Sequence, residues 1–344
     1  MVFLIQLILE KYLKYNKKSK YTLIVSKINM FKDKEELSNI LDFQYKHINP
    51  TPQIYWPKVF KRFGCKVLIK HENHTPIGSF KIRSSLTLIK NQLTKNINFC
   101  CASNGNYGQG IAFAANALIK KAKIFCPLKT SKSKINSISA FGVDVILKGK
   151  DFNETYEIAY NFSKKNDIIL LPSYSEDLAK GCATYSFEFF NKCNDLHKVY
   201  VPIGLGSGIC GTIFTRNLYN LNIEIIGVVP KEANSYFLSY KNKSLTSINQ
   251  VNTFAEGTAV RKPDKKALEI ISRNVSDIIQ IKEDEIKEAV RNIYDDTGNI
   301  AEGSGALAYA AAYKQREINK NKNIGIILTG GNIDRKFYSK ILSE

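Results

Sequence analysis

Short apolar runs alternate with amphipathic segments over most of the chain. The runs at 65–70, 123–128 and 143–149 are rich in Val, Ile, Leu and Phe and too short for helices, which is typical of buried strands. The segments at 109–121 and 153–166 place apolar residues at helical spacing. Strands that alternate with helices in this way predict βαβ units around a parallel sheet.

The pattern extends toward both ends of the chain. An amphipathic helix with an acidic first half is expected at 30–48. Before it, the apolar run at 2–9 is shorter than the roughly 20 residues that cross a bilayer, so we expect no membrane segment there. We treat residues 1–29 as an N-terminal extension, with Met30 as an alternative start. Further strands are expected at 97–103, 168–173, 197–203, 223–230 and 323–330, and further helices at 80–93, 132–142, 178–192 and from residue 209.

The composition is that of a globular protein. Of 344 residues, 44% are hydrophobic and 24% charged, and the length suggests about two domains. The seven cysteines are an odd number without C-x-x-C spacing. We therefore expect buried, reduced thiols in a cytoplasmic protein, and neither a disulfide framework nor a zinc site.

The net charge of +19 would favour nucleic acid or anionic lipid if it were gathered in one place. Lysines are instead spread along the whole chain among Asn and Ile, and no RNA-binding aromatic run or DNA-recognition helix is visible. A moderately positive surface that attracts small anions is the expected consequence. A non-catalytic, basic nucleic-acid-binding protein stays open as the alternative from another class.

Four loops at predicted strand ends carry the residues with chemical potential: 71–81, 103–108, 204–211 and 329–332. Ligands of parallel sheets bind at this edge. In the loop 204–211, Gly204, Gly206 and Gly208 permit a close approach of the backbone, and the helix that follows points its N-terminus at the bound group. The loop lacks Lys and Ser/Thr at P-loop spacing, so one phosphate fits better than a nucleoside triphosphate.

The same loop contains G-x-G-x-x-G, formed by Gly206, Gly208 and Gly211, which keeps an NAD-dependent oxidoreductase open as a rival. A dinucleotide site also needs an acidic residue at the end of the next strand to hold the ribose. That strand here ends in Val-Val-Pro at 228–230. The pattern therefore favours a single phosphate over a dinucleotide.

Lys81 opens a predicted helix between the apolar residues Phe80 and Ile82. A lysine at the positive N-terminus of a helix is placed unfavourably, and a surface position is the usual alternative. A functional role would account for the placement, because a desolvated amine forms a Schiff base with an aldehyde. A Schiff-base lysine and a cradle for one phosphate together indicate pyridoxal 5′-phosphate.

From about residue 48 onward the chain resembles the fold-type II pyridoxal-phosphate enzymes of the threonine/serine dehydratase family. The motifs that carry the resemblance follow the family's order: TPIGSFKIR (75–83), SNGNYGQGIAFAA (103–115), GLGSGICG (204–211), AEGTAVRKP (255–263), IAEGSGALAYAA (300–311) and TGGNID (329–334). Within the family the chain is most similar to the subgroup of threonine dehydratase-like proteins and hydroxyectoine-utilization dehydratase B.

The resemblance implies an α/β fold of the fold-type II, tryptophan synthase β-like kind, in which two parallel-sheet, three-layer domains hold the cofactor in the cleft between them. We expect a large cofactor-binding domain at 30–97 plus 182–344 and a small domain at 98–181. The resemblance also implies a cytoplasmic homodimer that binds a small amino acid, without nucleic-acid or membrane partners.

By the same resemblance Lys81 is the Schiff-base lysine and the general base for the Cα proton. Phe80 packs against the cofactor, and Asn106 hydrogen-bonds the 3′-oxygen of its ring. Thr329 stands near the pyridine nitrogen in place of the family's usual serine. The phosphate is assigned to Gly204, Leu205, Gly206, Ser207 and Gly208, and the substrate carboxylate to Ser103, Asn104, Gly105, Asn106 and Tyr107.

The implied reaction is an ammonia-lyase reaction, in which threonine or serine loses its β-hydroxyl and gives a 2-oxo acid and ammonia. A neutral hydroxyl at Thr329 does not enforce a protonated ring nitrogen, which suits elimination. Two alternatives use the same scaffold: a dehydratase in hydroxyectoine or ectoine breakdown, and β-replacement.

Several positions depart from the family pattern. Asn104 stands where racemising relatives carry a second serine, so racemisation is not expected, and Tyr107 replaces a usual histidine. The divalent-metal site of some relatives falls on Val229 and Ser235 here, so we expect no metal.

For two further pairs of polar residues, the role depends on the tertiary structure. His71 and His74 precede a turn and are not expected to bind a metal. Glu256 and Glu302 lie in Gly-bearing loops, and each either lines the site or caps a helix.

Overall fold

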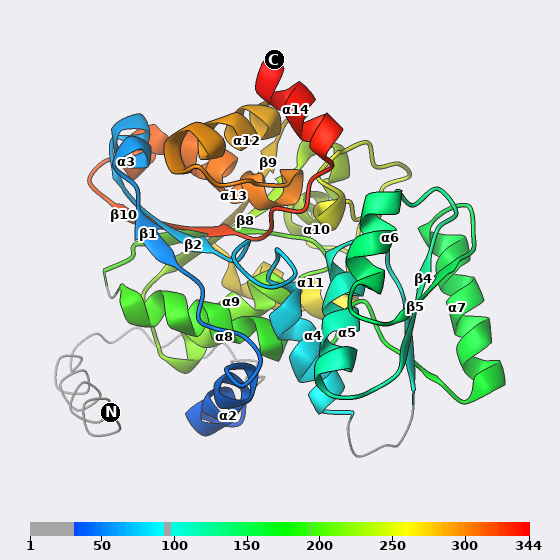
Figure 1. Ribbon diagram of the computed structural model, residues 1–344. Helices are drawn as coiled ribbons and strands as arrows, with labels where there is room; N and C mark the ends of the chain where they lie inside the picture. Colours follow the sequence, from blue (N-terminus) through cyan, green and yellow to red (C-terminus); the bar gives the residue numbers. More distant parts are fainter. Residues whose placement is uncertain (1–30, 93–97, 194) are drawn as a thin grey trace.

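The computed structural model describes residues 31–92, 98–193 and 195–344, whose arrangement Figure 1 shows. The extension predicted at 1–29 lies outside these residues. The strands form one six-stranded and one four-stranded sheet. This is the predicted α/β class with parallel sheets, except that one edge strand of the larger sheet runs antiparallel to its neighbour.

Both sheets have simple strand orders. The larger runs β1–β2–β10–β7–β8–β9, with only β1 antiparallel, and the smaller runs β5–β4–β3–β6, all parallel. The strand bounds are β1 (Gln53–Tyr55), β2 (Lys66–His71), β3 (Phe99–Ala102), β4 (Ala122–Cys126), β5 (Asp144–Leu147), β6 (Ile169–Leu170), β7 (Lys198–Pro202), β8 (Glu224–Pro230), β9 (Asp277–Ile281) and β10 (Asn323–Leu328).

The helices connect and cover these strands. They are α2 (Lys34–Gln44), α3 (Pro57–Phe63), α4 (Lys81–Lys90), α5 (Asn106–Ala117), α6 (Lys132–Ser139), α7 (Phe152–Asn166), α8 (Glu176–Lys192), α9 (Ser207–Leu218), α10 (Ser235–Asn242), α11 (Lys265–Asn274), α12 (Glu283–Thr297), α13 (Gly303–Lys314) and α14 (Arg335–Ser343), with short 3₁₀ turns η1 (Lys231–Ala233), η2 (Glu256–Thr258) and η3 (Arg316–Asn319). Within the described ranges, no helix is long and apolar enough to cross a membrane.

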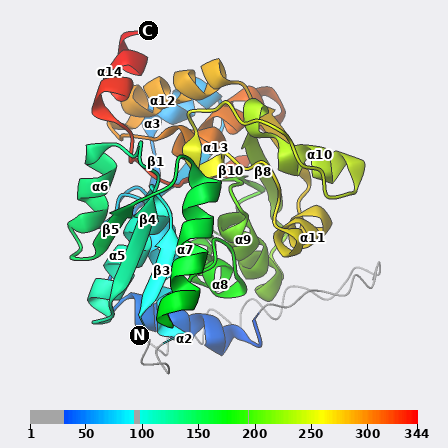
Figure 2. The same ribbon diagram turned by 90° about the vertical axis from the view of Figure 1, so that its right-hand side faces the viewer.

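Helices cover both faces of each sheet. In the larger sheet, α8 and α9 pack on one face, while α12 and α13 pack on the other. Figure 2 shows the smaller sheet between α5 and α7. Every residue of β7 and β10 is buried, as expected for central strands of a covered parallel sheet.

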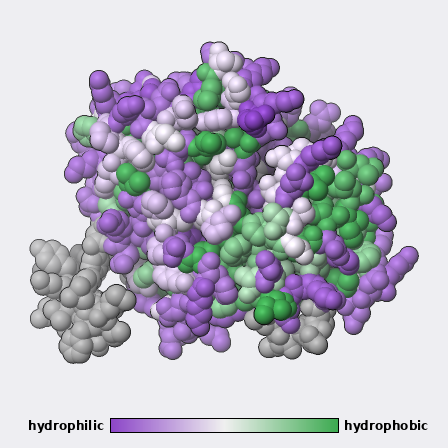
Figure 3. Space-filling model, in the orientation of Figure 1, coloured by the Kyte–Doolittle hydropathy of each residue, from purple (hydrophilic) through white to green (hydrophobic). Residues whose placement is uncertain are grey.

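Hydrophilic residues cover much of the face drawn in Figure 3, and apolar residues gather at its right, in the part of the molecule that holds the smaller sheet.

The sequence pattern located most elements between residues 65 and 230 but not their ends. The helix expected at 109–121 begins at Asn106, and that expected at 80–93 is α4. No element was predicted between 231 and 322, where the structure has α10 to α13 and β9. β9 is an edge strand with half-buried positions, so its apolar run is weak. The domain boundaries at 97/98 and 181/182 stay a prediction.

A buried cluster of two cations and two anions joins β2, α4 and α8. The Arg83 guanidinium lies 2.8 Å from Glu72 and 2.7 Å from Glu188, and Lys70 pairs with the second oxygen of Glu188. All four side chains are 5% exposed or less. Burial alone would raise the pKa of Glu188, but Arg83 and Lys70 hold it below its usual value. The cluster is balanced in charge, which is what makes its burial tolerable.

Two glycines let neighbouring helices contact the first turns of α4. A Cβ on Gly181 of α8 would lie 2.6 Å from the Arg83 carbonyl oxygen, and one on Gly110 of α5 would lie 2.9 Å from that of Lys81. The Gln44 amide also donates to the Arg83 carbonyl at 2.9 Å. Close packing from both sides and the ion cluster thus fix where α4 begins.

We expect Glu188→Ala to destabilise the protein by about 3–5 kcal/mol, because it leaves Lys70 and Arg83 buried with too little negative charge. The measurement is the free energy of unfolding from denaturant titration of the full chain. Asp277→Ala is the control, since the Asp277–Lys241 pair is exposed and its loss should cost about 1 kcal/mol or less. Equal effects of the two substitutions would contradict a structural role for the cluster.

Candidate active site

Lys81 is the first residue of α4, and its side chain reaches the first residue of α9. Its Nζ atom lies 3.4 Å from Ser207 Oγ and 4.9 Å from the centre of the Phe80 ring. Burial lowers the pKa of Lys81, while Cys182 and Glu302 oppose the shift. A lowered pKa increases the fraction of neutral amine, which is the form that attacks an aldehyde.

The loop between β7 and α9 is a tight cradle of backbone. Gly206 has φ +108°, and a Cβ on it would lie 2.7 Å from that of Ala267; a Cβ on Gly204 would lie 2.5 Å from the carbonyl oxygen of Gly257. Within the described chain, the backbone N–H groups at 205–207 have no acceptor. Free N–H groups at the start of a helix bind an anion. The loop therefore fits the phosphate of pyridoxal phosphate.

The loop after β3 presents a second set of free N–H groups. Ser103 Oγ accepts a hydrogen bond from the Gly108 N–H at 3.0 Å, which folds the loop back on itself. In the described ranges no acceptor faces the N–H groups of Asn104, Asn106 and Tyr107. These groups lie at the N-terminus of α5 and can receive a carboxylate.

Asn106 connects this loop to Glu302, the residue before α13. Its Nδ2 donates to Glu302 Oε1 at 2.8 Å, and its Oδ1 accepts from Asn332 Nδ2 at 2.8 Å. One N–H of the Asn106 amide is left for another acceptor. Burial raises the pKa of Glu302 to about 7, although the Asn106 hydrogen bond acts in the opposite direction.

Thr329 lies beside the start of α4. Its carbonyl accepts the Phe80 N–H at 3.1 Å, and its hydroxyl donates to the Ser304 carbonyl at 3.4 Å. The side chain is buried. The end of β10 is thereby joined to Phe80, the residue before Lys81, and to the first turn of α13.

These contacts bring most of the predicted residues together. Phe80, Lys81, Ser207 and Thr329 form one group, and Asn106 lies with Glu302 in a second. The Tyr107 side chain points elsewhere, because its hydroxyl donates to the Pro172 carbonyl at 2.6 Å.

The two glutamates that the sequence left open have different roles. The Glu302 side chain does not cap α13 and instead contacts Asn106. Glu256, in η2, forms an exposed ion pair at 2.5 Å with Lys134 of α6. Glu302 therefore belongs to the site, and Glu256 joins η2 to α6 at the surface.

The two places that the sequence analysis considered for a metal have other contacts. Trp56 Nε1 donates to His71 at 3.0 Å, and His74 contacts Asn299 at 2.5 Å. Ser235 Oγ donates to the Val260 carbonyl at 2.7 Å. Across the part of the chain that the structure describes, no group of three or more His, Cys, Asp or Glu residues could hold a metal ion.

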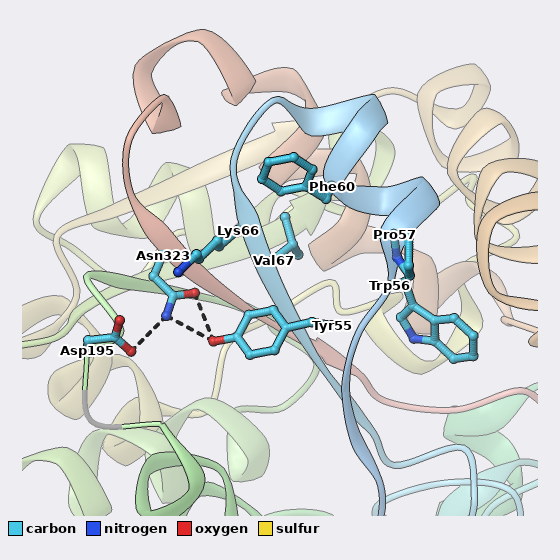
Figure 4. A pocket seen from close by; sticks show the side chains of 8 residues that line it. All are labelled: Tyr55, Trp56, Pro57, Phe60, Lys66, Val67, Asp195 and Asn323. Carbon is cyan, nitrogen blue, oxygen red and sulfur yellow. Dashed lines mark hydrogen bonds between the residues drawn. The ribbon is translucent and has the colours of Figure 1, made fainter.

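A separate pocket of about 320 Å³ lies at the opposite end of the strands (Figure 4). It is lined by the first residues of β2 and β10, Lys66 and Asn323, whereas Thr329 follows the last residue of β10. The Asn323 amide bridges Tyr55 and Asp195 across it. This pocket is not part of the site around Lys81.

No motif in the sequence predicts the residues that lie behind Lys81 and the loop 204–208. The sequence indicates only a buried thiol at Cys182, and it gives no signal for Tyr185 or Tyr236. Their contacts join segments 20 or more residues apart, from 208 to 185 and from 205 to 236, and no local pattern signals them.

The chain is similar to a known protein family and to a solved structure. A family model described as "Pyridoxal-phosphate dependent enzyme" matches residues 45–330. The chain is 31% identical to the solved structure of the processed form of threonine deaminase isoform 2 from Solanum lycopersicum, with a TM-score of 0.85. That match covers 90% of this chain and 87% of the other.

Two curated relatives extend the comparison. Threonine dehydratase 2 of Solanum lycopersicum, described as biosynthetic and chloroplastic, is 34% identical over 284 residues, which cover 80% of this chain and 47% of that protein. The chain thus spans about half the length of this relative. Serine racemase of Schizosaccharomyces pombe is 28% identical over 302 residues, covering 87% of this chain and 94% of that protein.

We expect Glu302→Gln to change how stability depends on pH. Between the ordinary glutamate pKa of 4.5 and the raised value of about 7, the folded chain holds this proton and the unfolded chain does not. The wild type therefore loses stability through this group as pH rises across that window, and the variant does not. The measurement is the free energy of unfolding of both cofactor-free proteins at pH 4, 6 and 8. A difference between them that stays constant with pH would contradict the assignment.

Proposed function

The chain belongs to the family of pyridoxal-phosphate dependent enzymes, and from this premise we propose that it is a threonine or serine dehydratase. The observation that carries the proposal is the position of Lys81. Its buried amine, with a lowered pKa, lies 3.4 Å from the hydroxyl of Ser207, within the loop 204–208. One small cofactor that carries an aldehyde and a phosphate can therefore place its aldehyde at the Lys81 amine and its phosphate at the loop 204–208.

Pyridoxal phosphate, when bound, withdraws electrons from the Cα atom of an attached amino acid and so acidifies its proton. Lys81 would attach to the cofactor aldehyde and, once the substrate amine had displaced it, would accept the Cα proton. Its lowered pKa supports both roles, because each requires the neutral amine. The β-hydroxyl leaves with a proton as water, and the remaining product is hydrolysed to a 2-oxo acid and ammonia.

We assign the other site residues to binding and orienting the cofactor and the substrate. We assign the phosphate to the backbone at 204–208 and the substrate carboxylate to the backbone at 103–107, because both loops have free N–H groups at a helix start. Phe80 packs against the cofactor ring. The remaining N–H of Asn106 would donate to the ring 3′-oxygen, and the neutral hydroxyl of Thr329 would stand beside the ring nitrogen.

Substrate, assembly and location are part of the proposal. Threonine and serine are favoured because the two Solanum lycopersicum proteins to which the chain is 31–34% identical are named threonine deaminase and threonine dehydratase. A dehydratase of hydroxyectoine breakdown and a β-replacement enzyme are the alternatives on the same scaffold. They would be distinguished by turnover of hydroxyectoine and by a requirement for a second, nucleophilic substrate. We further propose a cytoplasmic homodimer.

We expect Lys81→Ala to abolish release of 2-oxo acid from L-threonine and L-serine, and to lose the visible absorption of protein-bound cofactor after gel filtration. Lys90→Ala is the matched control, because Lys90 lies at the far end of the same helix. Its activity and spectrum should equal those of the wild type. If the Lys81 variant kept wild-type turnover, the proposal would fail. If the spectrum were present but neither amino acid reacted, only the substrate assignment would fall.

Serine racemisation is the second candidate, favoured by the similarity to the fission-yeast enzyme. Asn104 argues against it, because an amide has no proton to give at neutral pH, whereas a serine hydroxyl can act as an acid. We expect L-serine to yield 2-oxo acid without D-serine, as measured by chiral chromatography. Asn104→Ser should leave elimination in place and bring D-serine above background. D-Serine from the wild type would show that this interpretation of Asn104 is wrong.

A further inference from the structure

Two carbonyl groups of the glycine loop are held by buried tyrosine hydroxyls. Tyr236 of α10 donates to the Leu205 carbonyl at 3.0 Å, and Tyr185 of α8 donates to the Gly208 carbonyl at 2.8 Å. Both side chains are 1% exposed or less. The two tyrosines thus contact the two ends of the loop from different elements of the fold.

Holding a carbonyl also fixes the direction of the next N–H. In a planar trans peptide the carbonyl and the following N–H point in opposite directions, and the described chain contains no cis peptide. The Leu205 carbonyl turned to Tyr236 therefore directs the Gly206 N–H away from that tyrosine. In the same way, the Gly208 carbonyl turned to Tyr185 directs the Ile209 N–H away from Tyr185. Among the described residues neither N–H has an acceptor.

The tyrosine hydroxyls are fixed as donors. Asp264 N–H donates to Tyr236 Oη at 3.2 Å, which occupies the oxygen and leaves its hydrogen for Leu205. Burial raises the pKa of both phenols far above neutral, so they keep that hydrogen. Neither hydroxyl contacts Lys81 or any other residue assigned to proton transfer.

We propose that Tyr236 and Tyr185 are positioning residues that hold the loop 204–208 in its phosphate-binding form by binding its carbonyl groups from behind. The inference rests on the proposed function, because it takes this loop as the phosphate site. It deepens that function by assigning the affinity for the cofactor phosphate to two side chains outside the glycine motif.

The two contacts differ in redundancy. The Thr212 hydroxyl also donates to the Gly208 carbonyl, at 3.1 Å, so Gly208 keeps a donor when Tyr185 is changed. Among the described residues, the Leu205 carbonyl has only the Tyr236 hydroxyl as a hydrogen-bond donor. Tyr236→Phe should therefore act more strongly than Tyr185→Phe, and also more strongly than Tyr185→Phe with Thr212→Val, because Gly208 lies in α9 and its carbonyl keeps the helical backbone N–H of Thr212.

The experiment compares pyridoxal phosphate with pyridoxal, which lacks the phosphate, as ligands of the full chain. Dissociation constants are measured for the wild type, Tyr236→Phe, and the Tyr185→Phe/Thr212→Val pair. Tyr200→Phe is the matched control: its buried hydroxyl donates to Gln315 at 2.7 Å, away from the loop. Each phenylalanine keeps the ring and removes only the hydroxyl, and thermal unfolding of the cofactor-free proteins verifies folding.

We expect Tyr236→Phe to weaken pyridoxal phosphate binding by about 2- to 10-fold, the value of one hydrogen bond. Pyridoxal binding should not change, and Tyr200→Phe should bind both ligands as the wild type does. A preference for the phosphate that survives in both Tyr236→Phe and the Tyr185→Phe/Thr212→Val pair would overturn the inference. If the wild type itself bound pyridoxal as tightly as pyridoxal phosphate, the phosphate site of the proposed function would fail instead.

Discussion

Four helices begin at one place, and this convergence determines what the site can bind. The first residues of α4 and α9, Lys81 and Ser207, lie 3.4 Å apart, and the first residue of α5 contacts the residue before α13, Asn106 to Glu302, at 2.8 Å. Each helix start carries free N–H groups and a partial positive charge. Together they favour anions and disfavour a charged lysine. A phosphate, a carboxylate and a neutral amine are the groups such a place accommodates.

The convergence of these helix starts depends on packing contacts that lie outside the site itself. α4 can begin where it does because Gly110 and Gly181 allow α5 and α8 to contact its backbone, and because Arg83 binds carboxylates from β2 and α8. Arg83 follows Lys81 by two residues, so the buried ion cluster holds the same turns of helix that carry the reactive amine. Stability and site geometry therefore share one set of contacts.

Much of the site was predictable because its residues lie at strand ends. In a parallel sheet all carboxyl ends meet at one edge, so loops at 71–81, 103–108, 204–211 and 329–332 were expected to meet, and the structure joins residues from each. Lys81 was identifiable from its unfavourable position at a helix start. The sequence leaves the role of Glu302 undecided, because only the fold places Asn106 beside it.

The sequence by itself determined the α/β class and marked Lys81 and the loop 204–211 as candidate site residues, because each depends on local spacing: apolar periodicity, a lysine beside a turn, a glycine pattern. Only the tertiary structure decided which groups surround them. The Glu188 cluster joins residues about 100 positions apart, and Tyr236 meets Leu205 across 31. The half-buried edge strand β9 was missed for a related reason, since its burial comes from neighbours and not from its own pattern. Contacts across such separations are set by how helices pack on the sheet, which no short stretch of sequence encodes.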